Sequence, residues 1–228
     1  MAQIALIFDM DGTLLDSGRM SQLTYKETLA RLHARRLAMD VEWSDADILS
    51  VIGMTTTEIF RKLLPDVPEA VRDTALTVLE EVEAEYLPIY SALYPGVREV
   101  LPLLRSQGYR LFVASNGGAK YVATAAQIHG IEEVFEKLYC AGLQKTKSKV
   151  DLVAMLLEES KAEAAVMIGD RVSDIEAGKA NRILTVGCRY GIGGNAELQD
   201  ADAWIDHLAE LPDLLQKWIK EGSLCRRY

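Results

Sequence analysis

The chain has 228 residues, of which 49% are hydrophobic and 26% are charged, proportions that are typical of a globular protein and exclude disorder over most of its length. Its formal net charge of −9 argues against a nucleic-acid-binding surface, which requires a cationic face. No apolar run approaches the roughly 20 residues that cross a bilayer, and the first residues do not resemble a signal peptide.

The first predicted element is a buried strand at residues 4–8, and two acids follow it closely. Asp9 and Asp11 are two residues apart, so at an extended strand end their side chains point the same way and can flank one reacting atom. An Asp carboxylate is an established nucleophile for phosphorus, and a second carboxyl can protonate the leaving oxygen and later activate water. The alternative is a pair of acids in a turn, since Asp followed by Gly and Thr is common in turns.

Residues 18–93 are expected to form a helical domain that is inserted after the first strand. Apolar positions recur at helical spacing in residues 20–39, residues 44–52 begin with a capping Ser, and residues 68–90 form a long acidic amphipathic stretch. A structureless loop of this length would be implausible inside a compact domain. The inserted domain is expected to lie over the carboxyl edge of the sheet.

Beyond this insertion, short apolar runs alternate with helical patterns. The predicted strands are residues 111–114, 165–168 and 183–187, with weaker candidates at 138–141 and 203–205. The predicted helices are residues 97–107, 118–129, 148–160 and 173–181. Strand, helix and strand repeated in this way predict a parallel sheet that is covered on both faces. We therefore expect an α/β core domain, a Rossmann-like doubly wound parallel sheet, formed by residues 1–17 and 94–228.

Polar residues follow two of the later strands. Ser115, Asn116 and Gly117 lie between a strand and a helix, where backbone N–H groups and the positive end of the helix dipole face an anion. Asp170 ends another strand, and Asp174 lies four residues further on. Each segment alone has an ordinary explanation as a helix cap.

The carboxyl ends of parallel strands lie along one edge of a sheet, so the acids at these ends are expected to converge. Such a cluster would repel itself unless a cation neutralised it. Hard oxygen ligands with room for water suit magnesium. The sequence therefore predicts a magnesium site that includes Asp9, Asp11 and Asp170, with Asp174 placed to hold a metal-bound water.

Three alternate lysines, Lys145, Lys147 and Lys149, lie just before and at the start of the helix expected at residues 148–160. Positive charge is unfavourable at this end of a helix. The placement is explained if one ammonium reaches inward to the acids and a phosphate. The alternative for each lysine is a solvated basic loop.

Together these segments resemble the haloacid dehalogenase superfamily of phosphohydrolases. Residues 9–14 look like its first motif, Ser115 with Asn116 its second, and residues 169–174 its fourth. Lys149 or Lys147 is similar to the lysine of its third motif, and Lys149 is preferred because it matches the Lys-x-Asp variant of some members. The resemblance covers residues 4–187 and implies that the insertion is a helical cap domain.

This resemblance also implies the roles of the acids. Asp9 would be the nucleophile and a magnesium ligand, and Asp11 the general acid and base, with its backbone carbonyl on the metal. Asp170 would complete the Mg²⁺ site, and Asp174 would lie behind it.

The remaining residues of the motifs would handle the phosphate. The Ser115 hydroxyl and the backbone at Asn116 and Gly117 would hold phosphate oxygens. Lys149 would offset the negative charge.

The expected function is that of a magnesium-dependent phosphatase that acts through an aspartyl phosphate. Residues 51–60 resemble the cap loop of phosphoglycolate phosphatase-like members, so a small organic phosphate monoester is expected, with phosphoglycolate the leading candidate. A sugar-phosphate mutase of the same superfamily is the closest alternative, although no basic cap segment after Gly53 is evident to hold a second phosphate. A non-catalytic regulatory or binding module is a further alternative, but it has no use for an acid/base beside a nucleophile.

The expected partner is a phosphorylated small-molecule substrate, with no nucleic acid and no membrane, and the chain is expected to be a monomer or homodimer. Cys140, Cys188 and Cys225 form no CxxC pair, so the sequence suggests neither a disulfide framework nor a zinc site. A cytoplasmic location is expected because that compartment is reducing.

Overall fold

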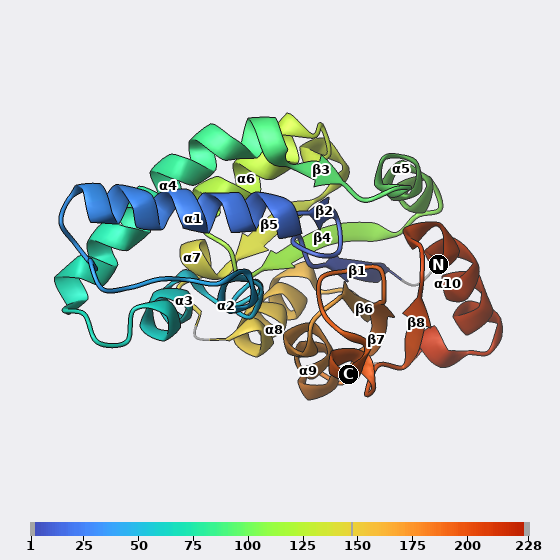
Figure 1. The fold of residues 1–228 in the computed structure, drawn as a ribbon. Helices are drawn as coiled ribbons and strands as arrows, with labels where there is room; N and C mark the ends of the chain where they lie inside the picture. Colours follow the sequence, from blue (N-terminus) through green and yellow to red (C-terminus); the bar gives the residue numbers. More distant parts are fainter. Residues whose placement is uncertain (1–2, 147, 226–228) are drawn as a thin grey trace.

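The protein is described by a computed structural model that covers residues 3–146 and 148–225. Within these residues six strands form one parallel sheet in the order β5-β4-β1-β6-β7-β8 (Figure 1). The strands are β1 (Ile4–Phe8), β4 (Arg110–Ser115), β5 (Lys137–Cys140), β6 (Ala164–Gly169), β7 (Leu184–Cys188) and β8 (Ala203–Ile205). From β1 the chain adds β4 and β5 on one side of that strand, and it then crosses over to add β6, β7 and β8 on the other side. The carboxyl ends of β1, β4 and β6 are therefore neighbours at the switch point, where open α/β sheets bind ligands.

Alternate side chains of the strands enter two separate apolar cores, because successive residues of a strand point to opposite faces. Leu6 and Phe8 enter one core, and Ala5 and Ile7 enter the other. The first face is covered by α5 (Val97–Ser106), α6 (Ala119–Ile128) and α10 (Leu211–Lys220). The second face is covered by α8 (Lys149–Ser160) and α9 (Val172–Ala180). This arrangement confirms the predicted doubly wound α/β fold.

A helical segment lies between β1 and α5 and has an apolar core of its own. Its helices are α1 (Gly18–Ala34), α2 (Asp45–Leu49), α3 (Thr56–Leu63) and α4 (Glu69–Tyr90). Leu32, Phe60 and Leu79 are buried together in this core, apart from both sheet cores. The long helices α1 and α4 pack side by side (Figure 1). An antiparallel pair of short strands, β2 (Leu15–Asp16) and β3 (Ala92–Leu93), brings the two ends of the segment together.

The helical segment differs from its sequence-based description at residues 51–60. The cap-loop resemblance covers this whole stretch, whereas α3 begins at Thr56. The Thr55 hydroxyl accepts a hydrogen bond from the Glu58 N–H, and the Glu58 carboxylate accepts one from the Thr55 N–H. This capping box fixes the start of the helix and leaves only residues 51–55 as the loop that faces the sheet.

Several short elements have no counterpart among the predicted ones. Besides α10, β2 and β3, these are α7 (Ala141–Gln144) and the 3₁₀ turns η1 (Glu132–Val134), η2 (Asn195–Leu198), η3 (Leu208–Glu210) and η4 (Ser223–Cys225). The helix expected at residues 20–39 ends at Ala34, and Arg36 and Ala38 have positive φ angles of 59° and 52°. A left-handed backbone at these two positions is incompatible with a continuing helix.

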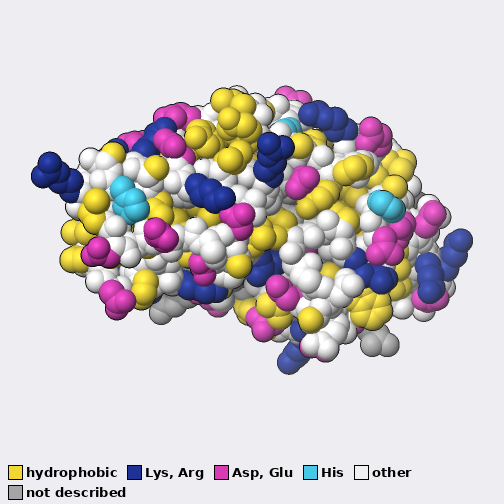
Figure 2. Space-filling model, in the orientation of Figure 1, with side chains coloured by type: hydrophobic (Ala, Val, Ile, Leu, Met, Phe, Trp, Pro, Cys, Tyr) yellow, Lys and Arg dark blue, Asp and Glu magenta, His cyan; other side chains and the backbone are white. Residues whose placement is uncertain are grey.

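On the face shown in Figure 2, Lys and Arg side chains are interspersed with Asp and Glu, so neither sign of charge dominates it. Among the residues the structure describes, no helix combines the length and the hydropathy that a membrane span needs. Cys140 and Cys188 are buried free thiols.

Candidate active site

Asp9 is fixed at the carboxyl end of β1 by the sheet itself. Its N–H donates to the carbonyl of Ile168 at 2.9 Å, so the pairing with β6 continues through this residue. Its Oδ1 accepts the N–H of Met10 at 2.8 Å, and only 2% of the residue is exposed. Gly12 has a φ of +79°, and a Cβ at this position would overlap the carboxylate of Asp170. The glycine that follows the two acids is therefore required by both the turn and the close approach of β6.

Three buried carboxylates meet beyond the ends of β1 and β6. Asp9, Asp170 and Asp174 each place one oxygen within 4.8 Å of the other two. The Nζ of Lys149 lies 2.8 Å from Asp9 Oδ2 and 2.6 Å from Asp174 Oδ1. In their ordinary charged forms, three carboxylates and one ammonium leave two negative charges in a buried space. We refer to these four residues as the acid cluster.

The electrostatics of the acid cluster fit a divalent cation. Burial raises the pKa of Asp9 to about 6, although Lys149 opposes the shift. Burial and the neighbouring Asp174 raise the pKa of Asp170 to about 7. Burial disfavours the ammonium of Lys149, yet the charges of Asp174 and Asp9 raise its pKa above the ordinary value. Lys149 thus compensates the carboxylates only in part, and three hard oxygen donors so close together could hold a divalent cation.

Asp170 is held in place by a glycine-rich segment after β7 that the sequence analysis did not identify. Its Oδ2 accepts the backbone N–H groups of Ile192 and Gly193 at 2.8 and 2.9 Å. A Cβ at Gly191 would overlap the Asp170 side chain, and one at Gly193 would overlap its carbonyl oxygen. The sequence Gly191-Ile192-Gly193-Gly194 is the signal that could have revealed this support, because clustered glycines indicate close backbone approach.

Asp11 lies apart from the acid cluster and is bound to a tyrosine. The hydroxyl of Tyr121, on α6, donates to Asp11 Oδ1 at 2.5 Å. Burial raises the pKa of Asp11, and the hydrogen bond from Tyr121 opposes this shift because it stabilises the ionised form. Tyr121 is absent from the sequence-based candidates, and nothing in its sequence position separates it from a core tyrosine.

At the end of β4, Ser115 and the two residues after it form a polar turn. The Oγ of Ser115 accepts the N–H of Gly117 at 3.0 Å, which leaves its own O–H available to donate. The Nδ2 of Asn116 donates to the carbonyl of Gly53 at 2.8 Å. α6 begins two residues beyond Gly117, so the positive end of its dipole lies at this turn.

The loop at residues 51–55 is held to the sheet edge by two side chains of the core. One is Asn116, through Gly53, and the other is Arg171, which follows β6. The guanidinium of Arg171 donates to the carbonyl of Ile52, and its Nε donates to Glu197 at 2.8 Å. Arg171 and Asn116 thus hold the helical segment closed over the acids.

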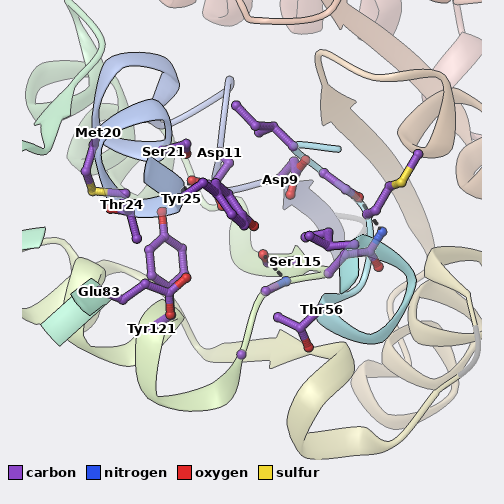
Figure 3. Close-up of a pocket in the computed structure, with 17 residues that line it drawn as sticks. Asp9, Asp11, Met20, Ser21, Thr24, Tyr25, Thr56, Glu83, Ser115 and Tyr121 are labelled. Carbon is purple, nitrogen blue, oxygen red and sulfur yellow. Dashed lines mark hydrogen bonds between the residues drawn. The ribbon is translucent and has the colours of Figure 1, made fainter. Parts of the chain in front are cut away.

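One cavity lies between the helical segment and the sheet. Asp9, Asp11 and Ser115 line it from the core, together with Asn116 and Gly117. From the helical segment it is lined by Met20, Ser21, Thr24 and Tyr25 of α1, and by Glu83 of α4. Figure 3 shows the labelled side chains of α1 and α4, with Tyr121, on one side of the cavity and Asp9 and Ser115 on the other.

Glu83 is an acid without a partner in this cavity. Among the described residues, none donates a hydrogen bond or forms an ion pair with its carboxylate. Burial raises its pKa to about 8, and the nearby charges of Asp11 and Glu80 add to the shift. A second cavity, of about 430 Å³, adjoins the first and is also lined by Glu83 and Tyr121.

The structure brings most of the sequence-based candidates to one place. Asp9, Asp170, Asp174 and Lys149 meet in the acid cluster. Asp11, Ser115, Asn116 and Gly117 line the cavity beside it. Lys147, the second choice for the lysine, lies outside the described residues.

The chain is similar to known hydrolases over most of its length. A family model described as haloacid dehalogenase-like hydrolase matches residues 6–188. A phosphoglycolate phosphatase of Colwellia psychrerythraea is 32% identical over 193 residues, which cover 82% of this chain and 84% of that protein. The pyrophosphatase PpaX of Listeria welshimeri is 28% identical over 199 residues, which cover 85% of this chain and 86% of that protein.

A similar fold occurs among solved structures. A structure from Haemophilus somnus, described as a predicted phosphoglycolate phosphatase, has a TM-score of 0.82 at 23% identity. The alignment covers 93% of this chain and 97% of that one. At this identity the likeness shows a shared fold.

Proposed function

Because this chain belongs to the haloacid dehalogenase-like hydrolase family, we propose that it is a magnesium-dependent phosphatase that forms an aspartyl phosphate on Asp9. Its substrate would be a small organic phosphate monoester. The cavity that is lined by Asp9 is also lined by Asp11 and Ser115, and this observation carries the proposal. A nucleophile, an acid/base and a phosphate-binding hydroxyl can then reach one substrate.

In the proposed reaction Asp9 attacks the phosphorus atom, and the bond between phosphorus and the ester oxygen breaks. Asp11 gives its proton to the departing oxygen, so an alcohol leaves. Asp11 then takes a proton from water as that water attacks the aspartyl phosphate, which releases inorganic phosphate and restores Asp9. The free hydroxyl of Ser115 supports a role in holding a phosphate oxygen, and Asn116 and Gly117 flank that position.

Magnesium would be held by Asp9, Asp170 and the backbone carbonyl of Asp11, with Asp174 behind them. A cation bound there would offset the charge of the phosphoryl group during transfer. Lys149 would also offset negative charge, because its ammonium contacts both Asp9 and Asp174. Two uncompensated negative charges in a buried space are what a divalent ion would balance.

We further propose that residues 18–93 act as a cap domain over the core domain of residues 1–17 and 94–228. The separate apolar core of α1–α4 supports this division. So do the contacts of Arg171 and Asn116 with the loop at residues 51–55, because a closed loop keeps bulk water from the aspartyl phosphate.

The relatives and the cap loop suggest which substrates to assay first. Curated relatives are named for phosphoglycolate and for pyrophosphate cleavage. Phosphoglycolate, which the cap-loop resemblance also suggests, is the first compound to assay. Release of free phosphate distinguishes a phosphatase from a mutase, which would return the phosphoryl group to its substrate.

The test is a panel of phosphate monoesters assayed for released phosphate with magnesium and with a chelator. We expect activity only with magnesium, and we expect Asp9→Asn to lower kcat by about a thousandfold or more, as for loss of other nucleophiles. Asp11→Asn should accumulate phosphoenzyme, seen as added mass on the intact protein after rapid quenching. Asp40→Asn, at an exposed position outside the site, is the control. Near wild-type turnover by Asp9→Asn would contradict the mechanism.

A further inference from the structure

The proposed reaction divides the active-site cavity into two sides. Asp9 and Ser115 lie on the side that takes the phosphoryl group, and Asp11 with its partner Tyr121 marks where the departing oxygen must lie. The rest of the substrate then extends toward the helical segment. We define the leaving-group side of the cavity by Ser21, Thr24, Tyr25 and Glu83 (Figure 3).

This leaving-group side offers no positive charge. None of the described residues that line the cavity is a lysine, an arginine or a histidine. Lys149 is engaged by Asp9 and Asp174, and Arg171 is engaged by Glu197 and the Ile52 carbonyl. Lys120 is exposed and lines only the adjoining cavity.

Glu83 provides the acid on this side instead, and because burial raises its pKa to about 8 it holds a proton near neutral pH until a cation meets it. Its carboxyl group shares the cavity with the phenols of Tyr25 and Tyr121, and each of these tyrosines has a pKa raised by burial and by nearby acids that include Glu83. No described side chain compensates Glu83, so an acid in a mostly buried position is left unpaired. Such a group costs stability unless a ligand supplies a donor.

We propose that Glu83 selects the substrate by binding an amine on its leaving group, so that the preferred substrate is the phosphate monoester of a small amino alcohol. This inference rests on the proposed function. A leaving group with only hydroxyl groups would be accepted less well. One with a carboxylate or a second phosphate would be disfavoured, since it would face Glu83 and Asp11 without a cation.

The expected preference depends on the charge of the leaving group that lies beside Glu83, because Glu83 is mostly buried. An ammonium would favour the ionised form of Glu83 and donate a charge-assisted hydrogen bond to its carboxylate, and such bonds are among the strongest in proteins. A carboxylate in the same place would be desolvated beside another acid, which is unfavourable for both. The substrate's own phosphate does not change this comparison, because it is common to all candidates.

Three esters of similar length separate these cases. They are ethanolamine phosphate, 2-hydroxyethyl phosphate and phosphoglycolate, whose leaving groups end in an ammonium, a hydroxyl and a carboxylate. We expect kcat/KM of the wild-type protein to fall in that order. In Glu83→Gln the preference for ethanolamine phosphate over 2-hydroxyethyl phosphate should fall by about 10- to 100-fold, the range expected for a hydrogen bond to a charged group.

The matched control is Glu81→Gln on the same helix. Glu81 is exposed, pairs with Arg35 at 3.2 Å and lines neither cavity, so its loss should leave the preference unchanged. A wild-type protein that prefers phosphoglycolate, or a Glu83→Gln variant with an unaltered preference, would overturn the inference. Failure of the proposed function gives a different result, namely no magnesium-dependent release of phosphate from p-nitrophenyl phosphate or from any of the three esters.

Discussion

The ammonium of Lys149 lies 2.6 Å from the carboxylate of Asp174, and both side chains are almost fully buried. Lys149→Met would remove the one cation of the acid cluster and leave three carboxylates facing one another. We expect the free energy of unfolding without metal to fall by about 3 kcal/mol, as when a buried ion pair loses one partner. Thermal unfolding in a chelator measures this loss, and magnesium should restore part of it.

Two other lysines test the specificity of that result. Lys217→Met, at an exposed position of α10, should leave both stability and activity unchanged. Lys147→Met decides between the two lysines that the sequence left open. Full activity and wild-type stability in a chelator are expected for this variant, whereas a loss of stability equal to that of Lys149→Met would contradict the assignment.

Asp170→Asn should abolish most of the stabilisation by magnesium and should stabilise the metal-free protein. Without metal, the variant should unfold at a higher temperature than the wild-type protein, because it removes a charge from a site that raises the pKa of this carboxyl to about 7. The amide oxygen can still accept the N–H groups of Ile192 and Gly193. With magnesium in hundredfold excess over its dissociation constant, the wild-type protein should gain about 5–10 °C and the variant little.

Thermal scans in chelator and in magnesium measure both effects. Asp66→Asn, at an exposed loop position, should respond to magnesium as the wild-type protein does. An equal gain in Asp170→Asn would show that the cation binds elsewhere.

Tyr121→Phe tests the hydrogen bond that holds Asp11. The Tyr121 hydroxyl favours the ionised form of Asp11, so its loss should raise the pKa of this carboxyl further. If Asp11 donates the proton, the alkaline limb of the pH profile of kcat should move to higher pH. We expect a fall in kcat of about tenfold, the value of one hydrogen bond to a charged group, with KM little changed.

Tyr109→Phe is the matched control, since Tyr109 is also buried in the core next to the sheet but lies outside the cavity. Steady-state kinetics across pH distinguish the two variants. A pH profile that does not move in Tyr121→Phe would separate Asp11 from the proton transfer.

Arg171→Ala should loosen the loop at residues 51–55, because the Arg171 guanidinium donates to the carbonyl of Ile52. We expect KM to rise by about tenfold, the value of one hydrogen bond to a charged group. Amide hydrogen exchange at residues 51–55 should become faster, because exchange reports local opening. In the control Arg189→Ala, which breaks an exposed pair with Asp206, neither quantity should change. Unchanged exchange in Arg171→Ala would show that the loop is closed by other contacts.

The sheet was predictable because its signal is local. Buried parallel strands appear in the sequence as short apolar runs, and even the weaker candidates near residues 138–141 and 203–205 are the edge strands β5 and β8. The convergence of Asp9 and Asp170 follows from the same topology, since parallel strands deliver their carboxyl ends to one edge.

The side chains that complete the site were not predictable in the same way. Tyr121 and Glu83 lie on amphipathic helices, where a single polar or aromatic residue has no distinctive spacing. Their significance depends on how α4 and α6 pack against each other and line the cavity beside Asp9 and Asp11, which is a tertiary relationship. The support of Asp170 by Ile192 and Gly193 is similar, although the glycines of that segment were a visible signal.

Glu83→Gln should stabilise the protein, and the gain in stability over the wild-type protein should increase with pH. The folded protein raises the pKa of Glu83 to about 8, against an ordinary value of 4.5. Below pH 4.5 both folded and unfolded chains hold the proton, so the residue has no effect on the pH dependence. Between pH 4.5 and about pH 8 the unfolded chain has released the proton of Glu83, whereas the folded chain still binds it. Rising pH in this range therefore favours unfolding of the wild-type protein.

Glutamine does not titrate, so the difference in melting temperature between Glu83→Gln and the wild-type protein should widen from about pH 5 to pH 8 and then level off. Thermal scans in chelator at several pH values measure it without interference from metal binding. Glu81→Gln, on the exposed side of the same helix, should show no such widening. A difference that stays constant with pH would mean that Glu83 is already compensated in the folded protein, and it would then be a poor site for an ammonium group.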